Sequence, residues 1–245
     1  MPTIYLSPST QENNQYVTGG SEEYYMNRIA DAMEPYLHAS GIGFVRNTPE
    51  MTAVTSIRQS NAGNYDLHLA LHSNAAPEGR YGQVRGTDVY YYPGSVRGER
   101  AAEIIADGLR KIYPYPQLVR TLATTRLGEV RQPAAPSVFI EFAYHDNPED
   151  AAWITENINE IAANVVQSLA QYFGLPFLQP EPVRTGRVTT DGGRLNLRAK
   201  PSVDAEVIDR MPNGSAVIIF GETDGWYVVQ YGGRIGYAAS RYITL

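Results

Sequence analysis

The apolar run at residues 67–71, Leu-His-Leu-Ala-Leu, is the feature that most restricts the fold of this chain. Such a run is typical of a strand that is covered on both faces inside a mostly parallel sheet. His72 follows at the carboxyl end of this strand, where open α/β sheets place their ligands. A second strand, at residues 136–142, delivers Glu141 in the same way. Together the imidazole and the carboxylate indicate a hydrolytic metal site, although either residue alone is more often a hydrogen-bonded part of a core.

Helical and extended patterns alternate along the first 177 residues. Strands are expected near residues 4–6, 44–46, 66–72, 86–92 and 136–142, and helices near residues 22–40, 51–62, 95–112 and 150–173. The last of these helices is predicted because apolar residues recur along it at steps of three and four. The alternation predicts an α/β fold in which a three-layer, mostly parallel sheet is flanked by helices.

The pattern changes after residue 177. Residues 178–185 contain two prolines in polar surroundings and are expected to form a short, stiff linker. Residues 186–245 show short alternating strands separated by glycine, which predicts a small all-β barrel. The expected organisation is therefore a catalytic domain at residues 1–177, a linker at 178–185 and a barrel at 186–245.

Composition limits the kinds of partner and site. The formal net charge is −6 and the pI is near 5.3, which argues against a nucleic-acid partner. Because the chain has no cysteine, a zinc ion would have to be held by histidine, carboxylate or amide groups. The sequence has no apolar run of about 18 residues and no basic leader, so it predicts no membrane span and no classical signal peptide. We expect a monomer.

Three segments within residues 3–175 carry a functional signature. They are Glu22-Glu-Tyr-Tyr-Met-Asn-Arg-Ile-Ala30, His72-Ser-Asn-Ala75 and Glu141-Phe-Ala-Tyr-His-Asp-Asn147. Their order and separations resemble the zinc-dependent N-acetylmuramoyl-L-alanine amidase family of type 3, which cuts peptidoglycan between the lactyl group of muramic acid and L-alanine. The resemblance implies that Glu22 and His72 are ligands of Zn²⁺ and that Glu141 is the catalytic carboxylate.

The sequence departs from this family directly after the first strand. Members usually have Gly-His-Gly there, which supplies a second histidine ligand. Residues 7–12 of this chain read Ser-Pro-Ser-Thr-Gln-Glu, an opening that some amidase-like sequences share. The third zinc ligand is then Gln11 or Glu12. A carboxylate is chemically the better zinc ligand, whereas Gln11 fits the opening of this subgroup better, so both are candidates.

Other polar residues near the motifs are expected to play supporting roles. His68 faces the same side of its strand as His72, but four residues span about 13 Å at ~3.3 Å each. Two imidazoles that far apart do not meet one zinc ion at ~2 Å, so His68 is expected in the core or behind the ligands. Asn74 and Asn147 are expected to support the ligands or contact substrate. His145 is expected at the surface or rim.

Residues 186–245 resemble the bacterial SH3-like module of wall-associated proteins. The matching segments are Leu195-Asn-Leu-Arg-Ala-Lys-Pro-Ser202, Met211-Pro-Asn-Gly214, Asp224-Gly-Trp226 and Gly236-Tyr237. The resemblance implies binding to peptidoglycan or the cell surface, with Asn196, Arg198, Trp226 and Tyr237 as candidate contacts. The alternative is that Trp226 and Tyr237 form the barrel core and the module only spaces or stabilises the enzyme.

We therefore expect a peptidoglycan hydrolase, either an autolysin or an endolysin, that cleaves the amide bond between N-acetylmuramic acid and L-alanine with zinc-activated water. Its partner would be peptidoglycan, and it would act outside the cell or in the bacterial wall. No signal peptide is visible, but a phage-type lysin released through a membrane hole would need none. Two alternatives are a zinc peptidase that cuts within the stem peptide and a non-catalytic wall-binding protein.

Overall fold

The computed structural model describes all residues from 1 to 245. The chain divides into two compact units. One contains Thr3–Met33 and Phe44–Tyr172, and the other contains Met1–Pro2, Glu34–Gly43 and Phe173–Leu245. The domain limits expected at residues 177 and 186 stay a prediction, to which the structure adds that Glu34–Gly43 group with the C-terminal strands.

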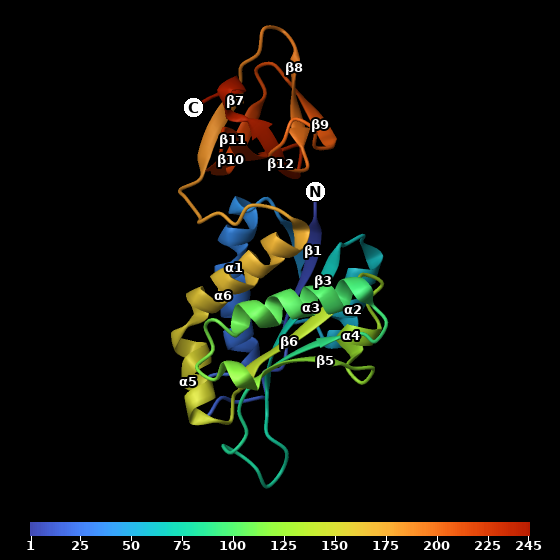
Figure 1. Ribbon diagram of the computed structural model, residues 1–245, viewed down its shortest axis with the longest axis vertical. Helices are drawn as coiled ribbons and strands as arrows, with labels where there is room; N and C mark the ends of the chain where they lie inside the picture. The colour runs from blue at the N-terminus through green and yellow to red at the C-terminus, as the bar shows by residue number, and fades with distance from the viewer. The chain divides into compact units, whose positions relative to one another are not determined.

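The first unit is built on a six-stranded sheet with the order β2-β1-β3-β6-β4-β5 (Figure 1). The strands are β1 (Thr3–Pro8), β2 (Gly43–Arg46), β3 (Leu67–Asn74), β4 (Thr87–Tyr91), β5 (Val119–Ala123) and β6 (Ser137–Tyr144). β3 pairs in parallel with β1 and β6, and β4 pairs in parallel with β5 but antiparallel with β6. The predicted α/β fold with a mostly parallel sheet is therefore confirmed.

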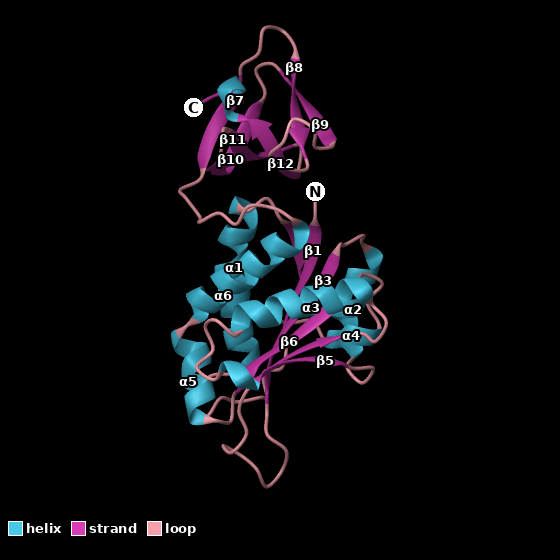
Figure 2. Ribbon diagram, in the orientation of Figure 1, coloured by secondary structure: helices cyan, strands magenta, loops and turns pink.

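Helices flank this sheet (Figure 2). They are α1 (Glu22–Ala39), α2 (Ala53–Ala62), α3 (Val96–Leu109), α4 (Gly128–Arg131), α5 (Pro148–Glu156) and α6 (Ile158–Phe173), with a 3-10 turn at Pro116–Leu118. Every residue of β3 before Asn74 is buried. Cover on both faces explains why this strand reads as a continuous apolar run. None of the helices combines the length and the apolar character that a membrane span requires.

The structure differs from the sequence-based prediction in two places. The helix expected at residues 150–173 is divided at Asn157, whose backbone leaves helical geometry and whose side-chain amide donates to the Trp153 carbonyl oxygen at 2.8 Å. The periodicity also fails to predict β5 and α4, because elements of five and four residues carry too little pattern. The second omission matters for function, since α4 carries the buried Glu129.

The second unit contains seven antiparallel strands in the order β13-β7-β10-β11-β12-β8-β9. They are β7 (Arg184–Val188), β8 (Arg194–Arg198), β9 (Val207–Pro212), β10 (Ala216–Thr223), β11 (Trp226–Tyr231), β12 (Arg234–Ala239) and β13 (Ile243–Thr244), with a 3-10 turn at Ser240–Tyr242. Apolar residues from each of these strands pack in one buried cluster. The prediction of a small all-β barrel of the SH3-like kind is confirmed.

Candidate active site

His72 and Glu22 meet at the carboxyl end of β3. His72 is only 6% exposed, and its Nδ1 lies 2.7 Å from Oε1 of Glu22, which sits in the first turn of α1. The other oxygen of Glu22 accepts a hydrogen bond of 2.6 Å from the side-chain amide of Asn14. The Glu22 carboxylate is 1% exposed and is therefore held in one orientation toward the imidazole.

Gln11 reaches the same point from the loop that follows β1. Its side-chain amide nitrogen lies 3.3 Å from His72 Nδ1 and 3.4 Å from Glu22 Oε1. Glu12 is exposed, and its charge acts on the neighbouring Glu23, whose pKa is raised first by burial and then by Glu12. Of the two candidates for the third ligand, the structure brings Gln11 to Glu22 and His72.

Glu141 stands beside His72 because the two residues are paired in the parallel register of β3 and β6. Its Oε2 is buried and has no hydrogen-bond partner. Burial raises the pKa of Glu141 to about 8; the charge of His72 opposes this rise, and the charges of Glu22 and Asp88 add to it. This carboxyl therefore gains and releases a proton near neutral pH, as a group that transfers protons in catalysis must.

Glu129 lies beside the other nitrogen of His72, and no sequence motif identifies it. Its Oε2 lies 3.2 Å from His72 Nε2, and its Oε1 lies 3.3 Å from His68 Nε2. Oε1 also accepts a hydrogen bond of 2.6 Å from the hydroxyl of Ser7. His68 thus lies behind Glu129, away from Gln11. The one local signal for Glu129 is an acidic residue beside the apolar Leu127 and Val130, which is too weak to identify a site.

The charges of this group are strongly coupled. Burial lowers the pKa of His72, but hydrogen bonds and charges from Glu129 and Glu22 outweigh burial and raise this pKa to about 10. Burial raises the pKa of Glu129, but hydrogen bonds from His68 and His72 bring it down to about 2. The pKa of Glu22 is also lowered, because its bond to His72 outweighs burial. Without a metal, the two carboxylates therefore favour the charged form of the His72 ring.

The donor atoms of Gln11, Glu22 and His72 fit a zinc ion. They lie 2.7–3.4 Å from one another, compared with about 3.3 Å between two ligands of a tetrahedral zinc with ~2.0–2.1 Å bonds. Rotation of the Gln11 amide exchanges its nitrogen for its oxygen, which is the atom that can bind a metal. Histidine, cysteine, aspartate and glutamate side chains alone form no group of three or more that could hold a metal.

Two cavities open beside these residues. One, of about 600 Å³, is lined by Glu141, Asn74, Tyr90 and the segment 122–127. The other, of about 410 Å³, is lined by residues of the loop after β1, by α2 and α4, and by His72 and Phe139. His72 lines the smaller of these cavities, and Glu141 lines the larger.

Asn147 and His145 lie elsewhere. The side chain of Asn147 caps α5 by accepting from the backbone nitrogens of Glu149 and Asp150, and it donates to the Gly82 carbonyl. Its observed contacts are therefore those of a loop anchor. His145 is 5% exposed, with Nδ1 3.1 Å from the Ser73 hydroxyl, so the expectation of a surface histidine is wrong.

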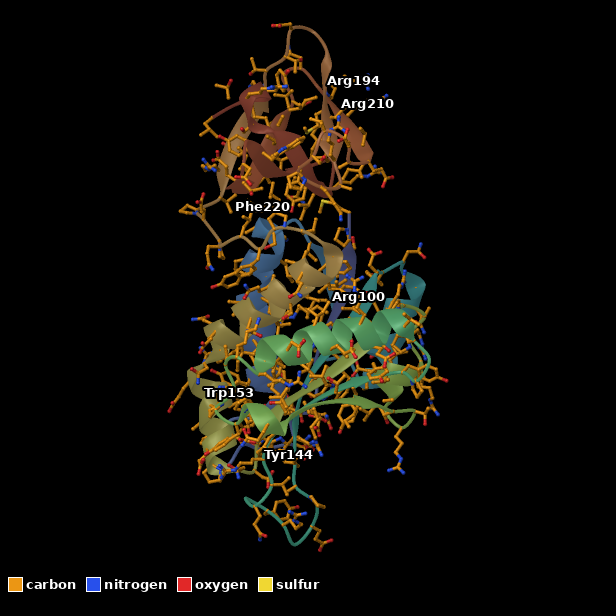
Figure 3. All side chains as sticks on the ribbon, in the orientation of Figure 1. Arg100, Tyr144, Trp153, Arg194, Arg210 and Phe220 are labelled. Carbon is orange, nitrogen blue, oxygen red and sulfur yellow. The ribbon has the colours of Figure 1, made fainter.

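The barrel has a cavity of its own, of about 430 Å³. Asn196, Arg198 and Trp226, three of the four predicted wall contacts, line it. Arg194 also lines it and is exposed at the start of β8 (Figure 3). Tyr237 is fully buried instead, and its hydroxyl donates to the Ser40 carbonyl at 2.9 Å. Tyr237 therefore belongs to the core of this unit, as the alternative interpretation proposed.

Comparison with protein families gives two matches. Residues 9–171 match the model of the N-acetylmuramoyl-L-alanine amidase family, and residues 193–244 match the model of the bacterial SH3 domain. The search of curated proteins found no match.

Solved structures share the fold of the first unit. The amidase AmiC2 of Nostoc punctiforme is similar with a TM-score of 0.62 and 17% identity, over 71% of this chain and 97% of that one. The catalytic domain of the CD27L endolysin, which targets Clostridia Difficile, is similar with a TM-score of 0.58 and 20% identity, over 70% of this chain and 98% of that one. The amidase Ami1 from Mycobacterium smegmatis is similar with a TM-score of 0.61 and 15% identity, over 71% of this chain and 97% of that one.

The unpartnered carboxylate of Glu141 predicts that its substitution stabilises the metal-free protein. Because the folded-state pKa of about 8 is higher than the ordinary 4.5, the folded state holds a proton that the unfolded chain releases. The contribution of this proton to the free energy of unfolding is therefore fully present below pH 4.5 and is lost as the pH rises to 8. Glu141→Gln should raise the free energy of unfolding by about 1–3 kcal/mol at pH 8 and by little at pH 4.5.

Urea unfolding of wild type and variant at both pH values, with the metal removed, measures this difference. A variant that is less stable than wild type at pH 8 would show that the Glu141 carboxylate is well solvated or paired.

Proposed function

Because this chain belongs to the N-acetylmuramoyl-L-alanine amidase family and is therefore a peptidoglycan amidase, we propose that it acts as a zinc hydrolase with Gln11, Glu22 and His72 as the ligands. The observation that carries the proposal is the approach of three donor atoms from separate segments to within 3.4 Å of one another. The bond that is cut is the amide between the lactyl group of N-acetylmuramic acid and L-alanine.

The catalytic carboxylate in this proposal is Glu141. A zinc ion bound here would lower the pKa of a bound water to about 7. Glu141 lies beside His72 in the register of β3 and β6, where its carboxylate would take a proton from that water and return it to the leaving amine. Asn14 and the backbone nitrogen of Ser73 hold the Glu22 carboxylate by hydrogen bonds and keep it from turning away.

The barrel is proposed to bind the wall through the cavity that contains Trp226. An aromatic side chain beside Asn196, Arg198 and Arg194 combines a stacking surface with groups that bind carboxylates and amides. Attachment to the polymer raises the local concentration of the enzyme without changing its chemistry. The place of action is the bacterial wall or the extracellular space, as a bacterial autolysin or a phage-type endolysin.

Removal of the catalytic carboxylate separates catalysis from metal binding. Purified wild type should contain about one equivalent of zinc. Glu141→Gln should keep the metal and lose about 10²–10⁴-fold in hydrolysis, since general acid–base catalysis contributes that much. His72→Ala and Glu22→Ala should lose both. Zinc is measured by elemental analysis, and a new free amino group on L-alanine identifies the bond that is cut.

Other outcomes would point to the alternatives. Wild type without metal or hydrolysis would favour a non-catalytic wall-binding protein. A new amino group on another residue of the stem peptide would favour a peptidase. Loss of zinc from the Glu141→Gln variant would indicate that Glu141 is a zinc ligand.

The third ligand is tested by a pair of adjacent variants. Gln11→Ala should raise the zinc dissociation constant by at least about tenfold, or ~1.4 kcal/mol, because it removes one of three donors. Glu12→Ala should change it little, because the Glu12 side chain interacts with Glu23, whereas Gln11 contacts Glu22 and His72. Competition with a chelator measures both constants, and the reverse ranking would make Glu12 the ligand.

The wall-binding proposal is tested in the full-length chain. Trp226→Ala should weaken binding to isolated cell walls by about tenfold, or ~1.4 kcal/mol, and should leave the rate on a small soluble muramyl peptide unchanged. Ile218→Ala, at an exposed apolar residue of the barrel that does not line the cavity, is the control. Equal wall binding by the two variants would show that Trp226 is not part of the binding site.

A further inference from the structure

The His72 ring is held by contacts on three sides. Its Nδ1 faces Glu22 and Gln11, and its Nε2 faces Oε2 of Glu129 at 3.2 Å. Phe139 stacks on the ring, with centroids 4.1 Å apart and planes 14° apart. Stacking fixes the plane of the ring, and the contacts at the two nitrogens fix which nitrogen points to each side.

A neutral imidazole has one nitrogen that carries a proton and one that has a free lone pair. Only the nitrogen with the lone pair can bind a metal. The nitrogen beside Gln11 and Glu22 is Nδ1, so the proton must be on Nε2 for the site to work. Oε2 of Glu129 is the acceptor that lies at hydrogen-bond distance from Nε2.

We propose that Glu129 is a positioning residue: its carboxylate accepts the Nε2 proton of His72, which holds the ring in the tautomer that offers Nδ1 to zinc. This inference rests on the proposed zinc site. A histidine ligand whose second nitrogen donates to a carboxylate is oriented by that bond and becomes a stronger base toward the metal.

Glu129 is itself held in place by groups from other elements. Its Oε1 accepts from the Ser7 hydroxyl of β1 at 2.6 Å and lies 3.3 Å from His68 Nε2 of β3. His68 is fixed in turn, with Nδ1 2.9 Å from the Ser60 hydroxyl of α2 and its ring stacked on Tyr5.

Glu129 is only 4% exposed. A buried carboxylate with partners on both oxygens cannot rotate away without leaving an unpaired charge. The acceptor for His72 is therefore in place before the metal arrives.

The matched test is Glu129→Gln, which keeps the shape of the side chain but gives it one acceptor and one donor in place of two acceptors. The zinc dissociation constant, measured by chelator competition in the full-length protein, should rise by about 10- to 100-fold. Asp150→Asn is the control. Asp150 is equally buried and bonded to Tyr113, Tyr144 and Gly86, but it does not touch His72. This variant should lose stability and keep its zinc affinity.

A spectroscopic measurement on the wild type keeps the inference testable even where Glu129→Gln fails to fold. The chain has four histidines, so ¹⁵N-labelled rings can be assigned with one variant for each. In the zinc-loaded protein His72 should show metal-bound Nδ1 and a protonated, slowly exchanging Nε2. Metal on Nε2 of His72 would overturn the inference.

Failure of this inference is distinct from failure of the proposed function. Wild type that binds no zinc contradicts the zinc site itself. Wild type that binds zinc, together with a folded Glu129→Gln protein whose zinc affinity equals that of wild type, leaves the zinc site intact and removes Glu129 from it. A merely structural role would lower stability in both Glu129→Gln and Asp150→Asn and would change zinc affinity in neither.

Discussion

The parallel pairing of β3 with β6 is the constraint on which the site depends. It puts His72 directly beside Glu141, and the register changes just after this pair. On the other side of β3, the pairing of Pro8 with Leu71 ends β1 at the same level, so the chain leaves β1 next to His72. The loop that begins there brings Gln11 to the imidazole. A slip of one residue in either ladder would turn these side chains to the opposite face of the sheet.

The two sides of His72 differ in how their charges are balanced. Glu22 and Glu129 are buried carboxylates, but each is paired with the imidazole and with further donors, so the cost of burial is offset. Glu141 is partly buried beside them, and its buried Oε2 has no partner. A fold selected for stability alone would pair this group or replace it. This imbalance raises its pKa, so the least stable part of the site is the part that we propose performs the chemistry.

The sequence-based predictions that are wrong share a cause. The sequence leaves Tyr237 open between a wall contact and the barrel core and predicts His145 at the surface or rim, and both residues are buried. Whether a residue is buried depends on which other segments pack against it. The sequence around the residue does not contain that information. The break at Asn157 is similar, because apolar residues keep helical spacing across it while the side chain bonds back to the preceding turn. Periodicity reports which face is apolar, and a short interruption leaves that pattern intact.

The sequence alone was enough for the α/β class and the all-β C-terminal region, because strand periodicity is local. It also suggested roles for Glu22, His72 and Glu141 through a family resemblance, and these roles stay predictions. It left Gln11 and Glu12 open and gave only a weak sign of Glu129. Those two questions depend on contacts between residues that are far apart in the chain: Gln11 lies 61 residues from His72, and Glu129 lies 57 residues from it. Folding brings such side chains together only through the packing of β1, β3 and α4, and no local pattern encodes a distance of that kind.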